Sequence, residues 1–447
     1  MPMSEPVSAR PPEGDAALIR AVGTFALTAA VINVIVGGGI FRMPSSLADK
    51  MGAAAPLALI AGALAIVPVA LCFAAIGSRT RATGGPYTYL TAVFGPFVGF
   101  VAGALMWISN IASSAAVAAA LSVQVGTLLP ALSDANGPWP RALLLTAVYA
   151  LLFALNAFGV KLGARAIAML AALKLTPLFL LACIGLFFVD WSQVSFAIGD
   201  VPSMSALGAS MVLVMFAYSG METALVPSGE LRDPARNVPR ATIAAILLVV
   251  LLYLGLQIVG QGLLGAGLAS SGVPVADTAA ALWPLGRTLL LITACISMAG
   301  FMMGNLLGTS RLVYALGRDG YLPRIFGRVT SQHRVPLFAL IAHALPAWIL
   351  ALGGTFDTLA LISGGAICLT YGLVAAAAWR AQRVDLRENG EPYVLAGGPL
   401  IPLVSVAAML AIVTTLKPDE WAAIGIALAA LVAIYLILHA MRARRVK

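Results

Sequence analysis

Twelve long runs of hydrophobic residues, separated by short polar segments, occupy almost the whole chain. A helix needs about 20 apolar residues to cross a lipid bilayer, and each run is close to that length or longer. The pattern therefore predicts an all-α membrane protein with twelve transmembrane helices, at residues 20–48, 54–77, 88–130, 140–158, 164–189, 204–229, 240–265, 280–316, 336–354, 356–379, 398–416 and 420–440.

The first run contains three consecutive glycines, Gly37 to Gly39, with Pro44 following them. Glycine weakens a helix and leaves the backbone N–H and C=O groups open to other partners. Non-helical backbone at membrane depth is tolerated only where it is buried in protein or lines a cavity. The glycines therefore indicate either a helix interrupted at a binding site or a close contact between two helices.

A similar interruption occurs in the sixth run, where Ser219-Gly220-Met221-Glu222 precedes Pro227. The first and sixth runs are five runs apart, so the two sets of five enter the membrane from opposite sides. Interrupted segments at corresponding positions of two inverted halves indicate the binding site of a secondary transporter. We therefore expect the two breaks to meet near the middle of the membrane. The two halves cover residues 20–190 and 204–379, with two further helices in 398–440.

Such a pair of breaks fits an α-amino acid. The half-helix beginning near Ile40 offers free N–H groups and a positive dipole end, which favour a carboxylate. The half-helices ending near Ile35 and Tyr218 offer carbonyl groups, which favour an ammonium group. The predicted binding residues on the two broken runs are Asn33, Val34, Ile35, Gly37, Gly38, Gly39, Ile40, Phe216, Ala217, Ser219, Gly220, Met221 and Glu222, and those on facing runs are Asn110, Ser113 and Met302.

Composition excludes several other classes of protein. Only 10% of the residues are charged and 61% are hydrophobic, whereas a soluble domain has about 25% charged residues. The net charge of +9 comes from basic residues in short loops, a pattern that sets membrane topology and does not indicate nucleic-acid binding. The four cysteines lie in apolar runs, so we expect no disulfide, metal or cofactor. No carboxylate pair or Ser/His/Asp set indicates an enzyme.

The basic residues also predict the orientation. With the N-terminus inside, 21 of the 27 Lys and Arg residues fall on the cytoplasmic side and only 4 on the outer side. The positive-inside rule then places both termini in the cytoplasm, which fits the plasma (inner) membrane. Residues 1–19 are expected to form a disordered cytoplasmic tail and residues 441–447 a second, short tail.

Four motifs resemble those of the amino acid-polyamine-organocation (APC) superfamily of permeases. They are Gly39-Ile40-Phe41 with Pro44, Thr83-Gly84-Gly85-Pro86-Tyr87 with Phe94-Gly95-Pro96, Phe216-Ala217-Tyr218-Ser219-Gly220-Met221-Glu222 with Gly229-Glu230-Leu231-Arg232-Asp233-Pro234, and Ser310-Arg311 with Arg318-Asp319-Gly320. The resemblance implies the LeuT-type fold, with a 5+5 inverted repeat, discontinuous helices 1 and 6, and transport by rocking of helices 1, 2, 6 and 7. Met221 replaces an aromatic residue common among relatives, which leaves the substrate side chain open.

Lys174 lies about eight residues into the fifth run. An intramembrane lysine costs about 2.5–3.5 kcal/mol on insertion scales, so it needs a partner or a function. In sodium-independent members of the superfamily, a lysine of the fifth helix occupies the place of sodium, and the resemblance implies this role for Lys174. Its ammonium could replace the cation permanently or carry a proton, with Ser297 as a second coupling candidate. The alternative is a lysine that extends to the cytoplasmic interface.

These patterns predict a secondary amino acid transporter, sodium-independent, working by proton-coupled symport or by exchange. The alternatives are an amino acid-sensing transceptor of the same fold, a permease for amines or polyamines, and a channel, which the lack of a continuous polar stripe disfavours. The expected partners are the amino acid, protons and the lipid bilayer, with no nucleic acid and no obligatory protein partner. For His343, alone in the ninth run, a structural role is the simpler interpretation.

Overall fold

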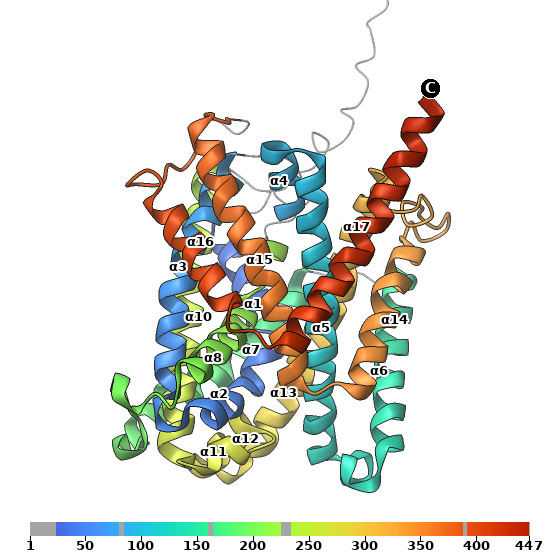
Figure 1. Ribbon diagram of the computed structural model, residues 1–447. Coiled ribbons are helices and arrows are strands. Elements are labelled where there is room, and N and C mark those ends of the chain that lie inside the picture. The colour runs from blue at the N-terminus through green and yellow to red at the C-terminus, as the bar shows by residue number, and fades with distance from the viewer. Residues whose placement is uncertain (1–23, 80–84, 160–163, 225–233, 388–390, 447) are drawn as a thin grey trace, which may run out of the picture.

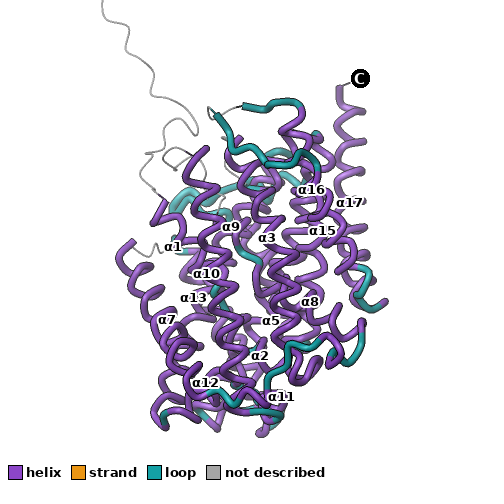
Figure 2. Tube along the Cα trace, turned by 90° about the vertical axis from the view of Figure 1, so that its left-hand side faces the viewer, coloured by secondary structure: helices purple, strands orange, loops and turns teal. Residues whose placement is uncertain are grey.

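The computed structural model describes residues 24–79, 85–159, 164–224, 234–387 and 391–446, and every regular element within these ranges is a helix. Most of the long helices run in roughly the same direction or its reverse and form one bundle (Figures 1 and 2). The predicted N-terminal tail, Thr83-Gly84 of the second motif and Gly229 to Asp233 of the third lie outside the described residues.

The helices have the following bounds. The α-helices are α1 (Thr24–Ile35), α2 (Met43–Met51), α3 (Ala55–Arg79), α4 (Pro86–Phe94), α5 (Pro96–Leu128), α6 (Pro138–Ala157), α7 (Ala164–Gly185), α8 (Met204–Tyr218), α9 (Met221–Ala224), α10 (Pro234–Leu264), α11 (Gly267–Ser270), α12 (Pro274–Leu282), α13 (Pro284–Arg318), α14 (Leu337–Gly353), α15 (Phe356–Arg383), α16 (Leu400–Val413) and α17 (Pro418–Val446). Short 3-10 helices are η2 (Gly39–Phe41), η3 (Gly52–Ala54), η4 (Pro130–Leu132), η5 (Asp134–Asn136), η6 (Leu186–Phe188), η7 (Trp191–Gln193) and η8 (Ile198–Asp200).

Local sequence explains where several helices begin. A proline stands at the first position of α5, α6 and α13, where its fixed φ suits a helix and its missing N–H costs nothing. The Ser203 hydroxyl accepts a hydrogen bond from the amide of Ala206 at 3.0 Å and so caps α8. Thr355 caps α15 in the same way through the amide of Thr358.

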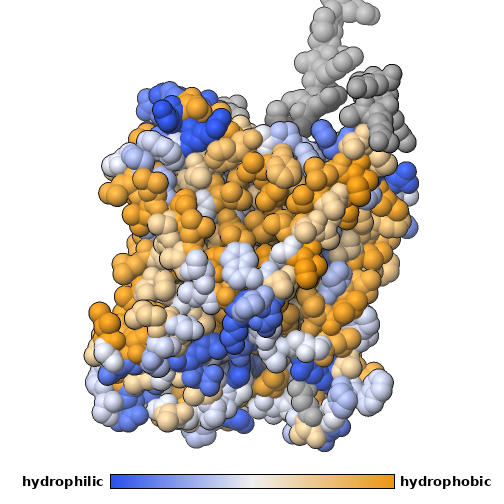
Figure 3. Space-filling view, viewed as in Figure 1, coloured by the Kyte–Doolittle hydropathy of each residue, from blue (hydrophilic) through white to orange (hydrophobic). Residues whose placement is uncertain are grey.

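Eight helical segments among the described residues are long and apolar enough to cross a membrane, and α8, α14 and α16 are shorter apolar helices. Figure 3 shows hydrophobic side chains over most of this face of the bundle, with hydrophilic residues at its upper end and in its lower part, where a patch extends toward the middle. Each of the twelve predicted runs contains helix, so the all-helical membrane class is confirmed. The count of twelve crossings and the inverted repeat stay predictions.

One predicted boundary is wrong. The single run at 88–130 consists of two helices, α4 and α5, because Gly95 takes a φ of +91° and Pro96 starts a new helix. The short tail predicted from residue 441 continues α17 as far as Val446, and its place in the cytoplasm stays a prediction. Neither glycine nor proline interrupts the chain between residues 426 and 446, so the sequence allows the helix to continue.

The core of the bundle is built around α5, which packs against α13, α14 and α15, while α3 packs against α10 and α15. The central part of α5, residues 112–120, consists of alanines, serines and one valine, all buried. Small side chains allow membrane helices to approach closely. As a result, α13, α14 and α15 can pack closely on α5, and Val117 of α5 lies against Gly38 where the first helix is broken.

Candidate functional site

The first predicted helix is interrupted after Ile35. Residues 36–38 are not helical, η2 makes one tight turn, and α2 begins at Met43. The amides of Phe41 and Arg42 bond back to the carbonyls of Gly38 and Gly39, at 3.3 and 3.1 Å. Within the described residues, the amides of Gly38, Gly39 and Ile40 donate to no backbone carbonyl. Three adjacent N–H groups therefore remain open at this turn.

The second interruption lies between α8 and α9. The amide and the hydroxyl of Ser219 both donate to the carbonyl of Phe216, at 3.3 and 2.7 Å, which ends α8. Gly220 then has a φ of +125°, a conformation that residues with a Cβ rarely adopt. The helix resumes as α9 at Met221. Glycine at position 220 is thus required by the backbone itself.

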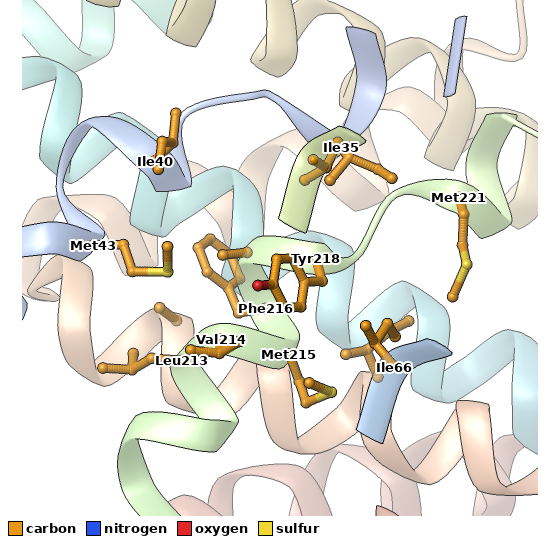
Figure 4. Close-up of a cluster of buried hydrophobic side chains, with 14 of the residues drawn as sticks. Ile35, Ile40, Met43, Ile66, Leu213, Val214, Met215, Phe216, Tyr218 and Met221 are labelled. Atoms are coloured by element: carbon orange, nitrogen blue, oxygen red, sulfur yellow. The ribbon is translucent and has the colours of Figure 1, made fainter. Parts of the chain in front are cut away.

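The two interruptions adjoin, as the sequence predicts. A Cβ added to Gly220 would lie 3.1 Å from Val34 Cγ1 and 3.2 Å from the amide nitrogen of Ile35. A Cβ added to Gly39 would lie 3.1 Å from the ring of Phe216. Figure 4 shows Ile35, Phe216 and Tyr218 around this junction, with Ile40 on the far side of the first break. Both breaks are therefore buried within protein, as backbone of this kind in a membrane requires.

Lys174 on α7 reaches the end of α1. Its Nζ atom donates hydrogen bonds to the carbonyls of Asn33 at 2.5 Å and Val36 at 2.7 Å, and the side chain is only 6% exposed. The carbonyls at a helix C-terminus carry partial negative charge, so they stabilise an ammonium group. The alternative in which this lysine extends to the membrane interface is therefore wrong.

Two further side chains bind the same segment of backbone. Ser297 of α13 donates to the carbonyl of Gly37 at 3.0 Å, and Tyr253 of α10 donates to the carbonyl of Ile35 at 3.0 Å. The expectation that the carbonyls near Ile35 are free for a ligand ammonium is wrong for these groups, because side chains of the protein occupy them. By contrast, the carbonyls of Ala217 and Tyr218 accept no hydrogen bond from the described residues.

The carboxylate of Glu222 forms hydrogen bonds within the protein. Its two carboxylate oxygens each lie 3.0 Å from the amide of Gly220, and Tyr371 donates its hydroxyl to one of them at 2.7 Å. The side chain is 4% exposed. Met221 beside it is fully buried in the hydrophobic core (Figure 4). In this conformation Glu222 stabilises the turn at Gly220, and a contact of either residue with substrate stays a prediction.

The predicted residues on facing helices differ in how far they are buried, and their contact with substrate stays a prediction. Ser113 and Met302 are buried, and Asn110 is partly exposed. Asn110 accepts a hydrogen bond from Asn305 of α13 at 3.3 Å. Asn305 was not predicted, although a polar residue in an apolar run one turn from Met302 could have indicated it.

Two residues that contact the glycines were also missed. Val117 of α5 faces Gly38, and Phe301 of α13 lies 2.6 Å from where a Cβ of Gly37 would stand. Both are apolar residues in apolar runs, so nothing in the sequence distinguishes them. Their contacts explain why the packing interpretation of the glycines is also correct: bulkier side chains have no room here.

Arg42 follows the first break, and within the described residues its guanidinium forms no ion pair with a carboxylate. Its guanidinium donates to the carbonyl of Ser271, next to α11, and to the hydroxyl of Ser45 at 3.2 Å. Ser45 in turn donates to the carbonyl of Ala269 at 3.0 Å. These bonds fasten α2 to α11, and both helices lie at the lower end of the bundle in Figure 1.

Replacing Arg42 by alanine is expected to loosen α11 from α2. Loss of the charged hydrogen bond to Ser271 should raise amide hydrogen exchange in residues 267–277 about tenfold. Mass spectrometry of the purified protein measures this. Lys50→Ala, on α2 just after Arg42, is the control and should leave exchange unchanged; equal effects of the two variants would contradict the assignment.

Comparison with known proteins identifies the family. A family model described as amino acid permease matches residues 22–438, nearly the whole chain. The chain belongs to this amino acid permease family. It is therefore a multi-pass membrane permease of the APC superfamily, and the prediction that it is a transporter and not an enzyme is confirmed.

Curated relatives of this permease are amino acid transporters. It is 27% identical to the serine/threonine exchanger SteT of Bacillus subtilis, over 86% of this chain and 87% of the relative. It is also 27% identical to the b(0,+)-type amino acid transporter 1 of Mus musculus, over 80% of this chain and 74% of the relative. The large neutral amino acids transporter small subunit 2 of Rattus norvegicus is 27% identical, over 81% and 70%. Because the last relative is named as a subunit, the comparisons do not support the expected lack of a protein partner.

Proposed function

We propose that this permease carries amino acids by alternating access without sodium, and that it works as an exchanger. The observation that carries the proposal is the pair of hydrogen bonds from Lys174 to the carbonyls of Asn33 and Val36. Carbonyl oxygens at the end of a broken helix are a site for Na⁺ in membrane transporters. An ammonium that is part of the chain supplies the positive charge there without a bound ion.

The substrate site proposed for this permease lies between the two breaks. The open amides of Gly38, Gly39 and Ile40 would bind the α-carboxylate, because oriented N–H groups at a helix start favour an anion. The carbonyls of Ala217 and Tyr218 would bind the α-ammonium group. The contact between Gly39 and Phe216 supports this pairing, since it joins the two half-sites directly.

Exchange is favoured over net uptake by the name of one relative, a serine/threonine exchanger. Proton-coupled symport is the second candidate, supported by Lys174, since an amine with two carbonyl partners could release and regain a proton during each cycle. For both candidates we propose twelve crossings and the inverted repeat, with helices 1, 2, 6 and 7 moving together. We also propose that both termini lie in the cytoplasm and that the protein is in the plasma membrane. The distribution of basic residues supports this orientation.

Counterflow in proteoliposomes tests this proposal. Vesicles preloaded with unlabelled serine or threonine should accumulate labelled substrate from outside equally well in sodium and in choline buffers, and empty vesicles should accumulate little. Accumulation in empty vesicles that requires an inward proton gradient would select symport. A strict requirement for sodium would overturn the proposal, and saturable binding without internalisation would point to a sensor.

A further inference from the structure

A chain of three hydrogen-bonded side chains runs from a partly exposed amide into the interior of the bundle. His343 Nε2 on α14 lies 2.8 Å from Asn305 Oδ1 on α13, and Asn305 Nδ2 donates to Asn110 Oδ1 on α5 at 3.3 Å. Exposure falls along this chain: Asn110 is partly exposed, Asn305 is 8% exposed and His343 is fully buried. Asn110 is therefore the open end and His343 the closed end.

The hydrogen bonds give this chain a direction. Asn305 Oδ1 can only accept, so His343 Nε2 must carry the hydrogen. Asn305 then uses its amide group to donate to the oxygen of Asn110. Asn110 accepts this bond through its oxygen, and among the described residues its NH₂ group has no hydrogen-bond partner, so it can donate to another group. The Nδ1 atom of His343 has no hydrogen-bond partner among the described residues, so the bond to Asn305 is the hydrogen bond that these residues give the ring.

Asn110 and Asn305 share their helices with residues that contact the broken first helix. Val117, which contacts Gly38, lies on α5 two turns beyond Asn110, and Phe301, which contacts Gly37, lies one turn before Asn305 on α13. Seven residues of helix separate Asn110 from Val117, about 10 Å along the axis. From a carboxylate at the open amides of the first break, a side chain of glutamine length could approach Asn110. Serine or threonine would be too short.

We propose that His343 is a positioning residue for substrate selection in this permease. It fixes Asn305, and through Asn305 it orients Asn110 so that the NH₂ group faces the substrate. The substrates selected in this way are amino acids whose longer side chains end in a hydrogen-bond acceptor, such as glutamine. The inference rests on the proposed transport of amino acids between the two breaks.

The test compares pairs of substrates of similar size. In His343→Leu, the apparent affinity for glutamine relative to methionine should fall about three- to tenfold, the equivalent of one neutral hydrogen bond. The affinity for threonine relative to valine should not change, because neither side chain reaches Asn110. His343→Gln, which keeps an N–H group at a similar position, should restore the preference for glutamine. All four substrates are measured by counterflow.

A second variant keeps the test informative if His343→Leu does not fold. Asn110→Ala should remove the same preference, and adding it to His343→Leu should change nothing further. A parallel loss of affinity for all four substrates would assign His343 a purely structural role. If the preference for glutamine over methionine rose in His343→Leu, Asn110 would present its oxygen to the substrate. Each of these two results would overturn the inference. Continued transport of methionine and valine separates these outcomes from a failure of the proposed function.

Discussion

Amino acid transport by the Lys174→Ala variant is expected to fall at least about tenfold. The substitution removes a charged hydrogen-bond donor and takes away the donor that the described residues give to the carbonyls of Asn33 and Val36. A buried carbonyl left unsatisfied costs about 1–3 kcal/mol, and 1.4 kcal/mol corresponds to a factor of ten. Initial rates of counterflow in proteoliposomes measure the effect.

Two variants make the Lys174 result specific. Lys174→Met keeps the length of the side chain without the charge, and it should be as inactive as the alanine variant if the ammonium is what matters. Lys50→Ala removes a lysine from α2 that is only partly buried, and it should transport normally. Normal transport by Lys174→Met would contradict a role for the charge, while gel filtration in detergent shows whether each variant is folded.

The Gly220→Ala variant is expected to lose most transport activity. A residue with a Cβ at a φ of +125° is strained by about 1–3 kcal/mol, and the methyl group would press on Val34 and on the backbone of Ile35. The two breaks should then separate, and the apparent affinity for substrate should fall about tenfold or more. Concentration dependence of counterflow measures this affinity.

A matched glycine on α13 provides the control. A Cβ added to Gly304 would meet no atom within 4 Å, and its backbone is helical, so Gly304→Ala should fold and transport as the unmodified protein does. If Gly220→Ala kept full affinity while remaining folded, the junction of the two breaks would not be the substrate site. Equal losses in both variants would indicate a general effect on the bundle.

Much of the fold could be predicted from hydropathy, because every long apolar run contains helix in the structure. The two breaks were also predictable, since three consecutive glycines and the Ser219-Gly220 pair weaken helices that are otherwise apolar. The boundaries of the helices were harder to predict than their presence. The division of the third run at Gly95 depends on a backbone conformation that a glycine allows but does not require.

The partners within the site could not be predicted in the same way. The resemblance placed Lys174 beside the first break, but which carbonyls it binds depends on how α7 is turned toward α1. The same applies to Glu222, whose carboxylate folds back onto the amide of Gly220. The pairing of Asn305 with His343 could not be predicted, because the sequence does not show that α13 and α14 face each other.

The two hydrogen bonds of Lys174 also affect the conformational equilibrium of the substrate-free protein. Its partners stand on either side of the last residue of α1, so any movement that takes this helix end away from α7 must break both bonds together. Hydrogen bonds to charged groups contribute about 1.5–3 kcal/mol each, so two bonds can bias a conformational equilibrium by a factor of about 10² to 10⁴. A carrier without substrate would then seldom change state, whereas a bound amino acid could supply compensating contacts in the next state. Return of the empty carrier would be the slow step, which is the kinetic condition for exchange.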